Sequence, residues 1–323
     1  MSDTPLHVMS IYRSVDQIPA GFGPSVASIG NFDGVHLGHR QILASVVAEA
    51  RALKARAVAV TFDPHPEQLL RPDKAPRLLT PMAERLRLLA EAGIDDVLIL
   101  PFDAALAGLS AQSFIRRILI EGLQIRGLHE GGNFRFGHRA HAGVTELADF
   151  GERLGFQVHV HEPVRVHGLE VSSSAIRERV FVGDMTRARW MLGRPFSVLS
   201  TSARGRGIGT RLLVPTVNLA PYDGILPAFG VYVTRLSVAR RRFQAVTNIG
   251  NRPTFGDASF AVESHILDFE PLDLDDQTPI ELEFLLRLRG EMHWPSIDAL
   301  KAQIFKDVAK AKRYFRLVRD PSL

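Results

Sequence analysis

The sequence GNFDGVHLGH at residues 30–39 decides the fold of the first half of the chain. It follows an apolar stretch at residues 25–29, which predicts a short β-strand. It runs into residues 36–55, where apolar side chains recur at the spacing of an amphipathic helix. A helix start presents free backbone N–H groups and the positive end of the helix dipole, so this junction predicts an anion site.

Two histidines in this stretch favour phosphate as the anion. His36 and His39 lie three residues apart, so on a helical turn they share one face and can both donate to phosphate oxygens. Gly38 lets a phosphate approach the backbone. The simpler interpretation is a pair of surface histidines beside a turn glycine, but the strand–helix junction favours phosphate chemistry.

The rest of the first half alternates strands with helices. Apolar runs predict strands at 57–62, 97–100, 123–128 and 156–160. Helices are predicted from Thr80-Pro81 onward, with Thr80 as cap and proline in the first turn, from Ser110 to Glu121, and over 144–154. This alternation predicts a parallel sheet covered on both faces, with ligands bound beyond the carboxyl ends of its strands.

After residue 195 the pattern changes to short alternating segments broken by glycine and proline. Segments at 231–236, 243–249, 265–269 and 280–286 predict a small antiparallel β-barrel, closed by a helix over 296–314. A helical stretch at 184–192 is predicted to join the halves. We therefore predict two domains, a Rossmann-like α/β domain at 1–185 and a β-barrel domain with a terminal helix at 186–323.

Composition excludes several classes of protein. The chain has no cysteine, which excludes disulfides and thiolate chemistry and suits a reducing cytoplasm. Its apolar runs are too short to span a bilayer, and the first ten residues lack the pattern of a signal peptide. We therefore predict a cytoplasmic protein. The net charge of +4 is concentrated in the second half, which suits nucleic acid or small anionic phosphates equally.

A second candidate phosphate element lies far from the first in sequence. Ser172, Ser173 and Ser174 open a predicted helix, and Arg177 follows within its first turn. Hydroxyls and helix-start N–H groups bind phosphates, and an arginine can clamp their oxygens. A serine run taken alone is more often a simple helix cap.

Together, the two phosphate elements resemble the nucleotidylyltransferase superfamily. With Thr61-Phe62-Asp63-Pro64-His65-Pro66 and Asn133-Phe134-Arg135-Phe136-Gly137, the first half resembles the FAD synthetase part of the prokaryotic riboflavin kinase/FMN adenylyltransferase family. The resemblance implies catalytic roles for His36, His39 and Arg177. It implies nucleotide binding by Gly30, Asn31, Phe32, Asp33, Gly34, Gly38, Ser172, Ser173 and Ser174, and flavin binding by Phe62, Pro64, His65, Asn133, Phe134 and Phe136.

The second half resembles riboflavin kinase in four stretches: PTVNL at 215–219, GVY at 230–232, NIGNRPTFG at 248–256 and ESHILDF at 263–269. The resemblance implies that Thr216 and Asn218 hold Mg²⁺ with the ATP phosphates. It implies that Glu263 is the general base and that Arg289 lies near the flavin. The glycine-rich loop that begins at Arg204 is predicted to cover the phosphates, with nucleotide-binding residues Arg204, Gly205, Gly207, Gly209 and Pro215.

The implied function is bifunctional: phosphorylation of riboflavin to FMN, and adenylylation of FMN to FAD with release of pyrophosphate. ATP, riboflavin and FMN are the expected substrates, and no nucleic acid, membrane or obligate protein partner is implied. Two alternatives stay open. In the first, the chain retains only one of the two activities. In the second, it is a non-catalytic regulator that binds flavin or RNA. The presence of Glu263 argues against the second alternative, because a binding protein does not need a general base.

Three departures from the family pattern bear on the sites. Asn133 stands where the family usually has aspartate, and His129-Glu130 is more polar than the usual strand end. Residues 210–214 lengthen the loop before Pro215. A scattered set of histidines shows no accompanying carboxylate pattern, which disfavours a transition-metal site: His129, His138, His141, His159, His161 and His167.

Overall fold

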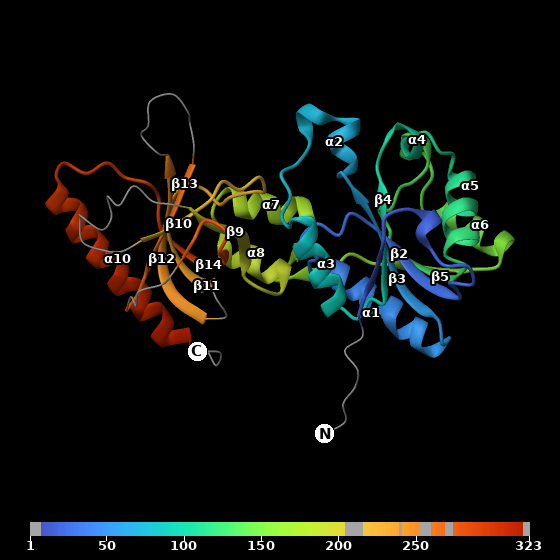
Figure 1. The fold of residues 1–323 in the computed structure, drawn as a ribbon, viewed down its shortest axis with the longest axis horizontal. Coiled ribbons are helices and arrows are strands. Elements are labelled where there is room, and N and C mark those ends of the chain that lie inside the picture. The colour runs from blue at the N-terminus through green and yellow to red at the C-terminus, as the bar shows by residue number, and fades with distance from the viewer. Residues whose placement is uncertain (1–7, 204–215, 239–240, 252–259, 269–273, 319–323) are drawn as a thin grey trace, which may run out of the picture. The chain divides into compact units, whose positions relative to one another are not determined.

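The structure is a computed structural model that describes residues 8–203, 216–238, 241–251, 260–268 and 274–318. It divides into two compact units, residues 1–172 and residues 173–323. Figure 1 shows helices and parallel strands in the first unit and a β-barrel in the second. The predicted domain boundary between residues 185 and 186 stays a prediction.

The first unit is built on a six-stranded parallel sheet, as the strand–helix alternation predicted. Its strands in order across the sheet are β1 (Ser10–Tyr12), β4 (Asp96–Pro101), β3 (Arg56–Asp63), β2 (Ser25–Ile29), β5 (Ile125–Gly131) and β6 (Gln157–His161). The chain runs outward from β2 through β3 to β4 and then returns to the other side of β2. The strand order therefore reverses between β2 and β5, where α/β folds of this kind bind ligands.

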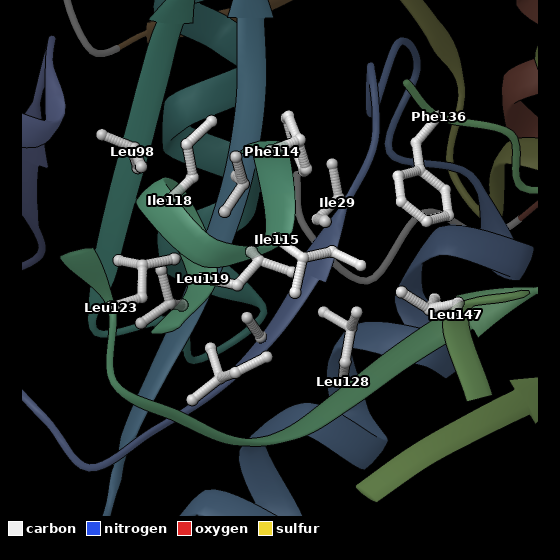
Figure 2. Packing of buried hydrophobic residues seen from close by; sticks show 14 of the residues in the cluster. Ile29, Leu98, Phe114, Ile115, Ile118, Leu119, Leu123, Leu128, Phe136 and Leu147 are labelled. Carbon is white, nitrogen blue, oxygen red and sulfur yellow. The ribbon is translucent and has the colours of Figure 1, made fainter. Parts of the chain in front are cut away.

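Helices cover both faces of this sheet, because successive strand residues alternate between two apolar cores. On one face, Val97 and Ile99 pack with α1 (Leu37–Ala52) and α3 (Met82–Glu91). On the other, Leu98 and Leu100 pack with α5 (Ala111–Phe114), the π-helical stretch η3 (Ile115–Gly122) and α6 (Val144–Leu154). Figure 2 shows this second core around Ile115, Leu119 and Leu128.

Shorter elements connect the covering helices and the strands. They are η1 (Val15–Gln17), α2 (Pro66–Leu70), η2 (Pro72–Lys74), α4 (Ala104–Ala107), η4 (His138–Ala140) and the small hairpin β7 (Arg165–Val166) with β8 (Leu169–Glu170). Among the described helices of the whole chain, none is both long enough and apolar enough to cross a membrane.

The start of α3 differs from its prediction. The helix begins at Met82 and Pro81 occupies the N-cap, where it makes no side-chain cap hydrogen bond. The hydroxyl of Thr80 lies instead 3.2 Å from the buried carboxylate of Asp33, to which it donates. A hydrogen bond to a carboxylate is stronger than the bond that the hydroxyl would make to an N–H group at the helix start. Thr80 therefore makes a tertiary contact with Asp33.

The second unit contains the predicted antiparallel barrel, which is closed by six strands. Around the barrel they are β10 (Thr216–Leu219), β13 (Phe260–Ile266), β12 (Arg241–Asn251), β11 (Gly230–Val238), β14 (Pro279–Arg289) and β9 (Phe196–Ala203). Inside it, Thr247 is hydrogen bonded to Thr234 at 2.6 Å and to Ser264 at 2.8 Å. These buried hydroxyls satisfy one another, which fixes the relative position of three strands.

The described residues of the second unit also include the helices α7 (Ser173–Phe181), α8 (Met185–Leu192) and α10 (Ile297–Val318). Helix α10 packs on the barrel through buried Ala311 and Phe315, which contact a core that includes Val233 and Leu285. Its inward-facing Asp307 is 2% exposed and accepts from Arg289 Nε at 2.9 Å. The barrel and the terminal helix are therefore joined by apolar packing and one largely buried ion pair.

The first unit buries a carboxylic acid beside the point where its strand order reverses. Glu130 on β5 is 2% exposed, and its Oε1 accepts from the backbone N–H of Ile29 at 2.7 Å. Burial raises the pKa of Glu130 well above its usual value of 4.5, and the Ile29 hydrogen bond opposes this only partly. At neutral pH the native state therefore still holds a proton here that the unfolded chain has already released.

We predict that Glu130→Gln stabilises the protein increasingly as pH rises. Below pH 4.5 both states of the wild type are protonated, whereas above it only the unfolded chain ionises, so native stability falls as pH rises toward the raised pKa. Glutamine keeps an acceptor for Ile29 and cannot ionise. Urea unfolding at about pH 5 and about pH 8 should show a larger gain at the higher pH. An equal gain at both values, or the same trend in the exposed control Glu152→Gln, would contradict this.

Candidate active sites

The loop between β2 and α1 has an unusual backbone. Phe32, Gly34 and Val35 have φ angles of 46°, 86° and 36°, all in the left-handed region. This region suits Gly34, but it is rarely adopted by an aromatic residue and is strained for the β-branched Val35. Strain of this kind persists only where the surrounding structure holds it, and it concentrates at functional sites.

Asp33 holds this loop in place. Its carboxylate is 1% exposed and accepts from the backbone N–H groups of Leu79 and Thr80, each at 3.0 Å. The N–H of Gly34 in turn donates to the Thr80 hydroxyl at 3.0 Å. Asp33 was predicted to bind nucleotide, and the structure shows it tying the loop to residues 79–80. Its role in nucleotide binding stays a prediction.

After this loop, His36 and His39 lie at the start of α1, as predicted from their spacing. His36 is the N-cap, and its Nδ1 accepts from the N–H of His39 at 3.3 Å. The two imidazoles are stacked with their centroids 3.6 Å apart, and the Phe32 ring packs edge-on against His39 at 5.3 Å. A Cβ on Gly38 would lie 3.2 Å from the His36 ring, so glycine here makes room for that ring.

His39 is the more unusual of the two histidines. The residue is half-buried, and its pKa is lowered well below 6.5, mainly by desolvation of the ring and also by nearby His36 and Arg85. Its ring is therefore neutral at pH 7. Among the described residues, its Nδ1 is one of the few buried side-chain atoms without a hydrogen-bond partner. Such an atom beside a helix start indicates a site that is completed by a ligand.

The second candidate phosphate element spans the boundary between the two compact units along the sequence. Ser172 is the last residue of the first unit, while Ser173, Ser174 and Arg177 belong to α7 at the start of the second. Ser174 is exposed and the other three are half-buried. The expected cooperation of this element with His36 and His39 stays a prediction.

The first group of predicted flavin residues follows the end of β3. Phe62 packs edge-on against Phe102 at 5.6 Å, and Pro64 is exposed after a cis peptide bond. His65 is buried and caps α2, where its Nδ1 accepts from the Glu67 N–H at 3.2 Å. Only Pro64 of the three is fully accessible, so contact of the others with a flavin stays a prediction.

The second group of predicted flavin residues follows the end of β5, which lies on the other side of β2 from β3. Asn133 is exposed, and the rings of Phe134 and Phe136 are stacked with their centroids 5.5 Å apart. Phe136 is 7% exposed and belongs to the apolar core shown in Figure 2, whereas Phe134 is only partly buried. Phe136 thus has a packing role, and Phe134 is the more accessible ring of the pair.

The barrel brings the predicted metal and base residues together. Thr216 and Asn218 lie two apart on β10, so they share one face of the strand. In the register of the barrel Asn218 is directly opposite Glu263 on β13, and Thr216 is opposite His265. Directly opposed residues in an antiparallel pair point to the same side of the sheet, so Thr216, Asn218 and Glu263 form one cluster.

Asn248 joins this cluster, although the sequence assigned it no role. It is the partner of Glu263 on the other neighbouring strand, β12, and is exposed. Glu263 therefore lies between the amides of Asn218 and Asn248 in adjacent strands. The only sequence signal for Asn248 was its place at the start of the stretch 248–256, because strand register does not follow from local sequence.

The structure gives Arg289 a definite partner. Besides its ion pair with Asp307, the guanidinium lies 5.4 Å from the centre of the Trp294 ring. These contacts account for its packing at the end of β14, and a contact with flavin stays a prediction. The predicted nucleotide-binding residues Arg204, Gly205, Gly207, Gly209 and Pro215, with the long loop 210–214, lie outside the described residues.

Family comparisons agree with this division into two chemistries. Residues 20–175 match the family model for FAD synthetase, and residues 192–315 match the model for riboflavin kinase. The chain therefore combines an α/β unit of the FAD synthetase type with a barrel of the riboflavin kinase type.

Full-length relatives carry both parts in one chain. The bifunctional riboflavin kinase/FMN adenylyltransferase of Escherichia coli K12 is 35% identical over 295 residues, which cover 91% of this chain and 94% of that protein. The protein of the same name from Pseudomonas fluorescens is 35% identical over 94% of this chain and 97% of its own. The chain belongs to the bifunctional riboflavin kinase/FMN adenylyltransferase family, and the resemblance seen in the sequence is confirmed.

A solved structure extends the similarity to the whole fold. It is described as a macrolide-efflux protein from Streptococcus pneumoniae and has a TM-score of 0.85 at 26% identity. The match covers 94% of this chain and 99% of that one.

We predict that Asp33→Ala destabilises the first unit by at least about 1–3 kcal/mol, because the buried N–H groups of Leu79 and Thr80 lose their acceptor. Asp33→Asn should cost less, since an amide oxygen still accepts. Urea unfolding followed by far-UV circular dichroism measures both. The exposed Asp73→Ala is the control, and an equal loss in Asp73→Ala and Asp33→Ala would refute the anchoring role.

Proposed function

We propose that this chain phosphorylates riboflavin to FMN in its barrel unit and transfers AMP from ATP to FMN in its α/β unit, forming FAD and pyrophosphate. One observation carries the proposal: each of the two different folds in this chain contains its own cluster of side chains suited to phosphate chemistry. The two activities in the relatives' name, riboflavin kinase and FMN adenylyltransferase, fit these two clusters. We further propose that the protein works in the cytoplasm.

In the adenylyl transfer, a phosphate oxygen of FMN attacks the α-phosphorus of ATP, and pyrophosphate leaves. Charge grows on the leaving pyrophosphate, so donors placed at the start of α1 lower the barrier. His36 and His39 are the donors in this proposal, with N–H groups of the loop that begins at Gly30. Arg177 and the hydroxyls of Ser172, Ser173 and Ser174 are proposed to hold the remaining phosphate oxygens.

The low pKa of His39 suits this role. A neutral imidazole does not attract anions before the nucleotide arrives, and a neighbouring triphosphate raises the pKa of the ring. The orphaned Nδ1 then has an oxygen to which it can donate. Binding of ATP at this site is therefore expected to strengthen the hydrogen bonding that the transition state needs.

In the kinase unit, the residues present fit Mg²⁺. Thr216 and Asn218 offer neutral oxygens on one strand face beside the carboxylate of Glu263, a donor set that suits a hard cation bound with phosphates. Mg²⁺ would neutralise charge on the transferred phosphoryl group. Glu263 is proposed to accept the proton of the ribityl terminal hydroxyl, with Asn218 and Asn248 fixing its orientation.

We predict that replacing both His36 and His39 with alanine abolishes FAD formation from FMN and leaves FMN formation from riboflavin within a few-fold. Each active site is proposed to depend on its own cluster, so only one activity should fall. Products from protein, ATP, Mg²⁺ and either flavin can be resolved by chromatography. The matched control is His138→Ala with His141→Ala, two exposed histidines of the same unit. Loss of both activities in a folded His36/His39 variant would mean that the clusters are wrongly assigned.

We predict that Glu263→Gln lowers kcat for FMN formation by about 10²–10⁴-fold, the usual contribution of a general base. Glutamine keeps the shape but not the basicity, so KM for riboflavin should change little, and FAD synthesis from supplied FMN should remain. Steady-state kinetics with each flavin separates the two constants.

A different split of the constants would change the role of Glu263. Near-normal kcat with a raised KM would make it a residue that positions the substrate. Unchanged kcat/KM would show that no base is needed, which a loose transition state allows.

A further inference from the structure

A cluster of metal-ligand side chains lies in the first unit and has no part in the proposed reactions. It joins Glu49 near the end of α1, His129 on β5 and His159 on β6. His129 Nε2 and His159 Nε2 lie 2.6 Å and 3.2 Å from Glu49 Oε2. The three potential ligand atoms all lie within 4.8 Å of one another.

The sheet and its covering helix hold this arrangement together. His129 and His159 are register partners on neighbouring parallel strands, and their rings stack with centroids 4.5 Å apart. Glu49 approaches from α1 over Gly127, where an added Cβ would lie 2.5 Å from its Oε1. Glycine at this strand position therefore makes the space in which the carboxylate reaches the histidines.

We propose that Glu49, His129 and His159 form a binding site for a divalent transition metal ion of the Zn²⁺ type. Two imidazole nitrogens and one carboxylate oxygen are a common three-ligand set for Zn²⁺, with a fourth position left for water. Tetrahedral bonds of about 2.0–2.1 Å place neighbouring ligand atoms about 3.3 Å apart. The distances from Glu49 Oε2 to the two histidine nitrogens, 2.6 Å and 3.2 Å, are close to this spacing.

One contact argues for a metal site over a simple hydrogen-bonded network. His159 Nε2 is buried and lies 3.2 Å from Glu49 Oε2, within ion-pair distance, yet it has no hydrogen-bond partner among the described residues. A network built for hydrogen bonding would pair this nitrogen. A metal ion placed between the three ligand atoms satisfies it through its lone pair.

His161 supplies the outer support that metal-bound histidines normally have. Its Nε2 lies 3.0 Å from Nδ1 of His129, on the side of the ring away from Glu49. With a metal on Nε2 of His129, the ring proton must be on Nδ1 and donates to His161. This contact orients His129 and fixes its tautomer.

The ion would act as a structural clamp. Glu49 follows His39 by ten residues on α1, which corresponds to about 15 Å at 1.5 Å per residue. The metal is therefore too far from the imidazole pair to take part in adenylyl transfer. It ties the end of α1 to β5 and β6, and the same helix carries His36 and His39 at its start.

The test is a Zn²⁺ titration of the full-length protein against a chromogenic chelator, in the presence of Mg²⁺. One tight site is expected in the wild type and in the His36/His39 double alanine variant. His159→Ala and Glu49→Gln each remove a ligand and should weaken binding by at least about 100-fold, more than the 10–100-fold expected for His161→Ala. The exposed His293→Ala is the matched control and should bind as the wild type does.

Two further measurements separate a metal site from a folding effect. Gly127→Ala keeps every ligand but displaces the carboxylate, so it should weaken Zn²⁺ binding while circular dichroism stays native. Zn²⁺ should raise the thermal midpoint of the wild type and not that of His159→Ala, whose side chain is 41% exposed in the native protein. Wild-type protein without a tight site, or tight binding that survives in His159→Ala, would overturn the proposal.

Discussion

The carboxylate of Asp33 is the constraint on which the cluster of His36 and His39, the first proposed active site, depends. A buried charge is tolerated only where donors surround it, and Asp33 takes them from the backbone at Leu79 and Thr80. That requirement fixes the strained turn containing Phe32 and Val35. This turn determines the direction in which α1 begins after β2, and therefore the position of its N-cap residue His36. The phosphate chemistry proposed for this helix start therefore depends on a hydrogen-bonded anchor that does not itself need to contact a ligand.

The barrel positions its chemical groups by strand register. Thr216, Asn218 and Glu263 come from two strands, and Asn248 comes from a third. Their alignment is maintained from inside by the hydroxyls of Thr234, Thr247 and Ser264, because a one-residue slip of β12 or β13 would separate these buried partners. The interior polar contacts and the outer cluster are thus two consequences of the same register.

The sequence predicted several elements well, for identifiable reasons. Helix 144–154 and strand 25–29 match their observed bounds because their patterns and boundaries are local. Strand β1 was missed because three residues carry no periodicity, and β5 lies a few residues later than predicted. Thr80 was taken for a helix cap because its partner Asp33 lies 47 residues away.

The same distinction separates the predicted site residues from the missed ones. His36 and His39 could be found because both lie in one turn. Glu49 could not, since it precedes His129 by 80 residues and reaches it only after α1 has packed across the sheet. The carboxylate pattern that the histidines lacked in the sequence is thus supplied by the fold. Strand pairing and helix packing decide such contacts, and a search restricted to local motifs will overlook them.

The two clusters at either end of α1 show how one helix can serve separate purposes. Its start combines the positive end of the helix dipole with His39, whose lowered pKa keeps its ring neutral, and this favours an anion that arrives with its own charge. Its last turns carry Glu49 toward His129 and His159, which favours a cation. The polarity of the helix makes this order physically consistent, because the positive end faces the proposed phosphates and the negative end lies near the proposed metal. Reversing the two clusters along the helix would place each ligand at the end that repels it.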